Sequence, residues 1–165
     1  MKFDELWNGY IKNEMVFMKK CKFKMDKTKH RGGFHMNKNV KLGIAFDDID
    51  AVTKDIERVL HIQFTEHESS YWGIYNLAKL SETENIRILY NFVDDDWQEE
   101  DYKDLPILIE LNRLNEPEKI VKVLSENVPY IVPLYLEEVE SRKFIRRYKY
   151  EDGLFKLDYE YIFKK

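Results

Sequence analysis

The stretch from residue 144 to residue 163, FIRRYKYEDGLFKLDYEYIF, places two aromatic-rich runs on either side of a short polar turn. The turn contains Asp152-Gly153, a pair that favours the positive backbone angles that tight hairpin turns require. We therefore predict a β-hairpin with strands over Phe144–Tyr150 and Leu154–Phe163. Alternation along the second strand predicts that its large apolar side chains share one face. These side chains are Phe155, Leu157, Tyr159, Tyr161 and Phe163.

Further strands are predicted upstream of this hairpin. Val40, Leu42, Ile44 and Phe46 alternate with smaller or polar residues, which is typical of one face of a strand. Short apolar runs bounded by turn residues predict the remaining strands. They lie at Ile62–Phe64, Trp72–Leu77, Ile86–Phe92 and Ile107–Leu111.

Three helices are predicted among these strands. Apolar residues at three- and four-residue steps indicate a helix that begins near Asp4 and ends near Met18. A second helix is expected over residues 49–60 with Asp50 as its N-cap, and a third is expected with Asn115 as its cap and Pro117 in its first turn. Helices interspersed among sequential strands predict an α+β fold, with a mainly antiparallel sheet, about three helices and a C-terminal β-hairpin.

Size and composition predict one folded domain over residues 1–165. The chain has 165 residues, of which 44% are hydrophobic, and this is enough to build a core. The sequence shows neither a secretory leader nor a run of roughly 20 apolar residues. Cys21 is the lone cysteine and cannot form an internal disulfide. We therefore expect a cytoplasmic protein with no membrane association.

Charge is strongly separated along the chain. Nine Lys or Arg residues lie between Lys19 and Lys41 against one acid, whereas seven acids lie between Asp94 and Asp104 against one base. The acidic segment is long for a loop without a function. Such a segment attracts and orients a cationic partner, and a tryptophan within it is typical of an interface anchor. The predicted partner-binding residues are Asp94, Asp95, Asp96, Trp97, Glu99, Glu100 and Asp101. Trp97 has an alternative role, in which it folds back and covers the sheet.

Two other functions stay open at this stage. The carboxylates of Asp94–Asp104 are ligands suited to a metal-dependent hydrolase, but they lack the alternation and the glycine of a calcium loop. The basic segment Lys19–Lys41 suits nucleic acid, with Phe23 and Phe34 as stacking groups. A net charge of −4 weighs against that function. No phosphate loop, metal-ligand spacing or catalytic group pattern is present, so we predict a binding protein without enzymatic activity, metal or cofactor.

Part of the chain resembles the small immunity proteins that accompany bacterial polymorphic and contact-dependent toxins. The resemblance covers Leu42–Leu111, less than half of the chain. It is carried by Leu42–Ile44, Asp47–Asp50, Ser69–Gly73, Asn91 and Leu105–Leu108. It implies a cytoplasmic inhibitor, or antitoxin, that binds a cognate toxin domain with a basic surface and blocks its active site.

Overall fold

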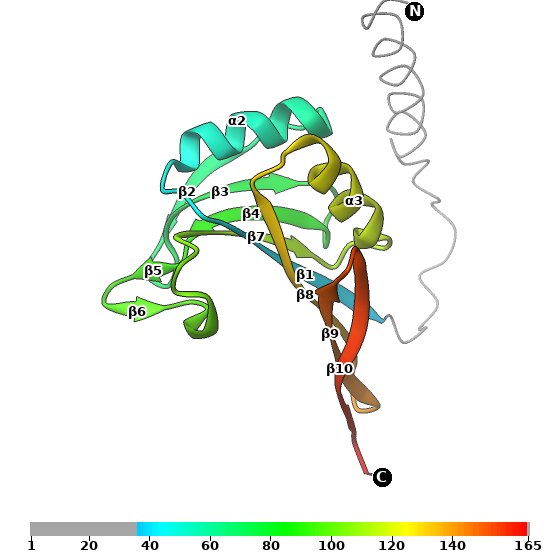
Figure 1. The fold of residues 1–165 in the computed structure, drawn as a ribbon. Coiled ribbons are helices and arrows are strands. Elements are labelled where there is room, and N and C mark those ends of the chain that lie inside the picture. The colour runs from blue at the N-terminus through cyan, green and yellow to red at the C-terminus, as the bar shows by residue number, and fades with distance from the viewer. Residues whose placement is uncertain (1–35, 165) are drawn as a thin grey trace, which may run out of the picture. The chain divides into compact units, whose positions relative to one another are not determined.

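The computed structural model describes residues 36–164, which lie in one compact unit, Phe34–Lys165. Eight strands form a single sheet in the order β10-β9-β8-β1-β7-β4-β3-β2, and every neighbouring pair is antiparallel (Figure 1). The elements in chain order are β1 (Asn37–Ile44), α2 (Ile49–Leu60), β2 (Thr65–Ser69), β3 (Gly73–Lys79), β4 (Asn85–Tyr90), β5 (Phe92–Val93), β6 (Asp96–Trp97), η1 (Glu100–Tyr102), β7 (Ile107–Asn112), α3 (Pro117–Asn127), β8 (Ile131–Glu140), β9 (Phe144–Glu151) and β10 (Leu154–Ile162).

The core lies between the central strands and the two helices. Leu42 of β1 is opposite Ile109 of β7, which is opposite Ile88 of β4, and all three side chains are fully buried. Because side chains alternate between the faces of a sheet, this row belongs to the face that α2 and α3 cover. Within residues 36–164 no α-helix covers the other face, which we call the open face (Figure 1).

Helix α2 forms where the apolar spacing predicts it, but Asp48 rather than Asp50 caps it. The Asp48 carboxylate accepts a hydrogen bond from the Ala51 amide at 2.9 Å. Val52 and Ile56 bury completely against the sheet. Helix α3 has Pro117 in its first turn as predicted, but the residue at its N-cap is Glu116 instead of Asn115, with no side-chain capping bond.

The prediction of an α+β fold with about three helices is wrong, because the sheet dominates and residues 36–164 contain two α-helices. The helix expected near Asp4 lies outside the described residues. One long strand, β8, was not predicted from the sequence. It contains Pro133, and proline has no backbone N–H to donate a hydrogen bond to a neighbouring strand. Pro133 is tolerated because the register between β1 and β8 shifts beside it, and prolines within sheets concentrate at such irregularities.

The C-terminal hairpin is confirmed as β9 and β10, with positive φ at Asp152 and Gly153 in its turn. The prediction that five apolar side chains share one face of its second strand is wrong. The register shifts between Leu157 and Tyr159, so the strand contains a β-bulge at Asp158. Phe155 and Leu157 lie on one face of β10, and Tyr159, Tyr161 and Phe163 lie on the other.

Candidate functional site

The acidic segment folds into a small projecting hairpin followed by one turn of 3-10 helix. Strands β5 and β6 pair Phe92 with Trp97 and Val93 with Asp96. The two turn residues, Asp94 and Asp95, have φ of 51° and 61°, as a tight type I′ turn requires. We call Phe92–Trp97 the acidic hairpin, which extends away from the sheet in Figure 1.

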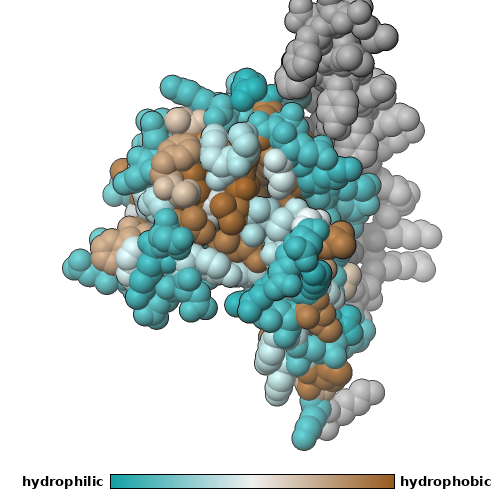
Figure 2. Space-filling model, in the orientation of Figure 1, coloured by the Kyte–Doolittle hydropathy of each residue, from teal (hydrophilic) through white to brown (hydrophobic). Residues whose placement is uncertain are grey.

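An aromatic pair and three aspartates form the surface of this hairpin. The rings of Phe92 and Trp97 lie 4.7 Å apart between centroids. Phe92 is 47% exposed and Trp97 is half-buried. Asp94, Asp95 and Asp96 are exposed. Figure 2 shows a small hydrophobic patch at this corner, ringed by hydrophilic residues.

The β2–β3 turn lies beside the acidic hairpin and was not predicted to belong to the site. The side-chain amide of Gln98 donates to the carbonyl of Tyr71 at 3.5 Å. A Cβ at Gly73 would lie 3.1 Å from Val93 Cγ1. Tyr71 itself is 68% exposed. The corner of the molecule therefore presents two exposed aromatic side chains, Tyr71 and Phe92, next to the aspartates.

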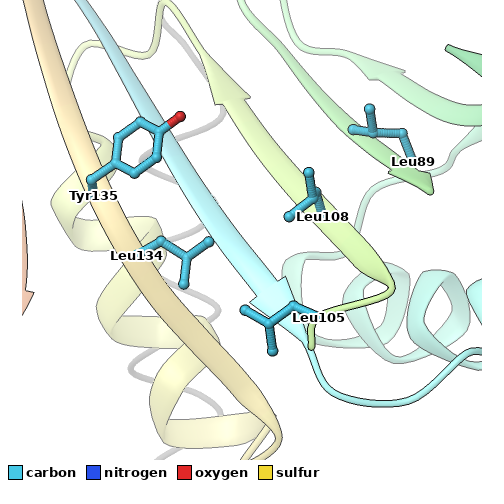
Figure 3. Packing of buried hydrophobic residues seen from close by; sticks show 5 residues of the cluster. All are labelled: Leu89, Leu105, Leu108, Leu134 and Tyr135. Atoms are coloured by element: carbon cyan, nitrogen blue, oxygen red, sulfur yellow. The ribbon is translucent and has the colours of Figure 1, made fainter. Parts of the chain in front are cut away.

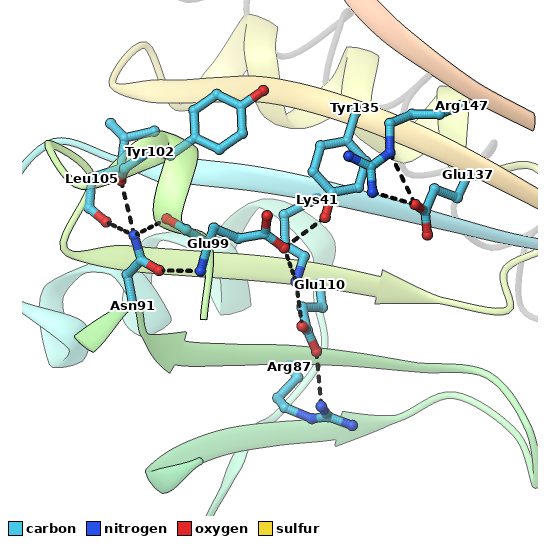
Figure 4. A network of polar contacts seen from close by, with 10 residues as sticks. All are labelled: Lys41, Arg87, Asn91, Glu99, Tyr102, Leu105, Glu110, Tyr135, Glu137 and Arg147. Atoms are coloured by element: carbon cyan, nitrogen blue, oxygen red, sulfur yellow. Dashed lines mark hydrogen bonds and ion pairs between the residues drawn. The ribbon is translucent and has the colours of Figure 1, made fainter. Parts of the chain in front are cut away.

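Asn91 fixes the base of the acidic segment. Its side chain is fully buried, and its amide donates to the carbonyls of Tyr102 at 2.9 Å and Leu105 at 3.0 Å (Figure 4). The amide also lies 3.3 Å from the Glu99 carbonyl, and the side-chain oxygen accepts from the Glu99 amide at 2.8 Å. A buried polar group is costly unless it is paired, so this residue strongly favours one path for the segment.

Glu99 is the acidic residue that points into the molecule. One carboxylate oxygen accepts a hydrogen bond from the Tyr135 hydroxyl at 2.6 Å and lies 2.9 Å from the Lys41 ammonium (Figure 4). The Glu99 side chain is only 18% exposed. Since strands β1 and β8 supply the two partners, Glu99 anchors the acidic segment to the open face.

The anchor continues as a row of charges across strands β1, β7 and β4. Lys41 lies 2.7 Å from Glu110, and Glu110 lies 2.8 Å from Arg87. The register places these residues directly opposite one another, where opposite charges stabilise a sheet. The Arg87 guanidinium lies 3.8 Å from the centroid of the Trp72 ring.

The electrostatics of the row keep Lys41 and Tyr135 protonated. Burial alone would lower the pKa of Lys41, but Glu110 and Glu99 outweigh that effect and raise it. Burial, together with the hydrogen bond to Glu99, raises the pKa of the Tyr135 hydroxyl. Both groups therefore donate to carboxylates at neutral pH.

An apolar cluster lies beneath the acidic segment on the open face. Leu105 follows η1 and packs with residues of β4, β7 and β8, as Figure 3 shows. A Cβ at Gly43 would lie 2.4 Å from Leu105 Cδ1, so Leu105 occupies the space above that glycine. The cluster comprises Leu89, Leu105, Leu108, Leu134 and Tyr135, with Trp72, Tyr75 and Tyr102 packed against it.

The predicted site residues fall into two groups. Glu99 and Trp97 are partly covered by the molecule, through Tyr135 and Phe92 respectively. Glu100 is exposed and pairs with Lys103 at 3.0 Å. The exposed residues of the predicted set are Asp94, Asp95, Asp96, Glu100 and Asp101.

Several basic residues of the described part pair with acids of the same chain. Lys38 lies 2.7 Å from Glu118, and Lys41 belongs to the row described above. The remainder of the basic segment, up to residue 35, lies outside the described residues. In the C-terminal hairpin, Arg146, Arg147 and Lys149 pair with Glu160, Glu137 and Asp158 respectively.

Within residues 36–164, no group of three or more His, Cys, Asp or Glu side chains could hold a metal ion. Neither α2 nor α3 is long and apolar enough to cross a membrane. Comparisons with protein-family models, with curated proteins and with solved structures find no match.

Proposed function

We propose that this chain is a non-enzymatic protein-binding module, an immunity protein that neutralises a cognate bacterial toxin with a basic surface. The observation that carries the proposal is the acidic hairpin, which presents Phe92 and three aspartates to solvent from an anchored base. The resemblance of Leu42–Leu111 to immunity proteins supports the same assignment. A toxin that acts inside the cell would meet its inhibitor in the cytoplasm, which is the location we propose.

The two parts of the surface have different physical roles. Exposed aspartates raise the association rate with a cationic protein, because opposite potentials steer the encounter. A partly exposed aromatic side chain supplies binding energy when the partner covers it. Glu99, Asn91 and Lys41 are positioning residues, since they hold the hairpin in place before the partner arrives. Such preorganisation reduces the entropy lost on binding.

The test uses the C-terminal domain of the protein encoded immediately upstream as the probe. Its binding to the full chain is followed by stopped-flow and calorimetry over a salt series. The double variant Asp94→Asn with Asp95→Gly removes two charges and retains a sequence that type I′ turns favour. We expect the association rate at low salt to fall by about tenfold, with a weaker salt dependence.

A matched control removes the same charge from the turn between β9 and β10. Glu151→Gln with Asp152→Asn should leave the association rate unchanged. Phe92→Ala should instead accelerate dissociation and weaken the affinity by roughly 30-fold, as expected for an interface anchor. Wild-type protein that does not bind the probe, or equal effects of the two double variants, would reject the proposal.

A further inference from the structure

The two edges of the sheet differ sharply within residues 36–164. At one edge, β2 has five residues with the sequence TEHES. Short, charged edge strands resist pairing with other chains. At the opposite edge, β10 has nine residues with the sequence LFKLDYEYI, and only β9 pairs with it. The edge formed by β10 therefore leaves a long row of backbone N–H and C=O groups available for pairing with another strand.

Large apolar side chains are exposed along this edge. They are Leu154, Leu157, Tyr159, Tyr161, Ile162 and Phe163, and each is between 39% and 66% exposed. Figure 2 shows hydrophobic residues among hydrophilic ones along the β9–β10 hairpin. The rings of Tyr161 and Phe163 lie 5.0 Å apart on the same face of β10. An exposed apolar edge of this kind is typical of an interaction surface.

The backbone direction shows which residues can pair outward. The Phe163 amide donates to the carbonyl of Lys143 at 2.9 Å, so the polar groups of Phe163 point toward β9. Backbone polar groups alternate in direction along an antiparallel strand. Those of Tyr161 therefore also face β9, whereas those of Glu160 and Ile162 point toward the free edge.

The sequence of this edge is complementary to itself. Antiparallel pairing about a two-fold axis at Tyr161 sets Glu160 opposite Ile162 of the partner subunit, and both residues have outward-pointing backbone groups. Tyr161 then faces Tyr161 of the partner subunit, and Tyr159 faces Phe163 of the partner subunit. These pairs do not share hydrogen bonds, so their side chains approach most closely. Asp158 lies opposite Lys164 of the partner subunit, which pairs opposite charges.

We propose that β10 is a homodimerisation edge, at which two copies of this chain pair through Tyr159–Phe163 and join their sheets. Aromatic cross-strand contacts and opposite charges at the ends of the segment both favour a second copy as the occupant. The acidic hairpin follows β4, which lies beyond β7, β1, β8 and β9 in the order of the sheet. The dimer would therefore carry two acidic hairpins at sites remote from the joined edges.

The test measures mass and strand register in the full chain. Light scattering over a concentration series should give twice the chain mass of 20.1 kDa. Tyr161→Lys sets two like charges opposite each other at the two-fold axis and should abolish the dimer. The same substitution at Tyr71, an exposed tyrosine of the β2–β3 turn, should leave the dimer intact. Circular dichroism checks that each variant is folded.

Register is tested by a disulfide across the two-fold axis. In a Cys21→Ser background, Tyr161→Cys should crosslink to its own copy under mild oxidation, because non-hydrogen-bonded pairs have closely spaced Cα atoms. Glu66→Cys on β2 should not crosslink. A mass of 20.1 kDa at every concentration, with no crosslink at residue 161, would overturn the proposal. A strand of a different protein would then be the remaining candidate to pair with β10. A dimer that persists in Tyr161→Lys would also overturn it.

Discussion

The Tyr135 hydroxyl donates a hydrogen bond of 2.6 Å to the Glu99 carboxylate, and this contact connects β8 to the acidic segment. The two residues are 36 positions apart in the chain. Because Glu99 immediately precedes η1, this contact fixes the position of the acidic segment relative to the sheet.

Tyr135→Phe removes the hydroxyl and keeps the ring, including its contact with the Arg147 guanidinium at 4.3 Å from the ring centroid. A hydrogen bond to a charged group contributes about 1.5–3 kcal/mol, so we expect a loss of about 2 kcal/mol in the free energy of unfolding. Urea unfolding at neutral pH measures this loss of stability. Tyr150→Phe serves as the control, and equal stabilities of wild type and Tyr135→Phe would contradict the prediction.

Alkaline pH should weaken the same contact. The folded state raises the pKa of Tyr135, through burial and the Glu99 bond, whereas an unfolded tyrosine ionises near pH 10. Above that pH the unfolded chain releases the proton first, so the contribution to stability is complete below about pH 10 and declines as pH rises further. The stability difference between wild type and Tyr135→Phe should therefore shrink between about pH 10 and pH 11.5. Denaturant unfolding at several pH values checks this, and a difference that grows with pH would have the wrong sign.

Asn91→Asp should loosen the acidic segment from its base. A carboxylate has the same shape as the amide but cannot donate to the carbonyls of Tyr102 and Leu105, which then face it across 2.9 and 3.0 Å. Burying unpaired polar groups costs several kcal/mol, and we expect a loss of at least about 3 kcal/mol in the free energy of unfolding. Hydrogen exchange should accelerate at the Gln98 and Glu99 amides. Exchange at wild-type rates would show that Asn91 does not fix the segment.

Gly43→Ala should destabilise the fold by overpacking. The added methyl would lie 2.4 Å from Leu105 Cδ1, and overpacked cores lose about 1–3 kcal/mol. Leu105→Ala alone should also destabilise, because it leaves a cavity. In the double variant the new methyl occupies part of that cavity, so its loss should be smaller than the sum of the two single losses. Additive losses in a double-mutant cycle measured by thermal unfolding would contradict the contact between residue 43 and Leu105.

Local patterns were sufficient for several elements of the fold. The alternation from Val40 to Phe46 predicted β1, which ends at Ile44, the apolar spacing after Ile49 predicted α2, and Asp152-Gly153 predicted the final hairpin. These features depend on neighbours in the chain, whose spacing and backbone preferences act over a few residues. The exposed acids Asp94 and Asp95 also lie in a turn, and aspartate tolerates the left-handed conformation found there.

Other features depend on contacts between distant residues and have no local pattern. Strand β8 contains Pro133, which is accommodated only because β1 shifts its register beside it. The bulge at Asp158 reverses the faces of the aromatic side chains that follow it. Glu99 resembles its acidic neighbours in the sequence, yet it points inward because Lys41 and Tyr135 reach it from separate strands. The charge and periodicity of the chain thus specify several of the strands and the place of the acidic segment, whereas the assembled sheet decides which acids remain exposed, because only the sheet brings their partners together.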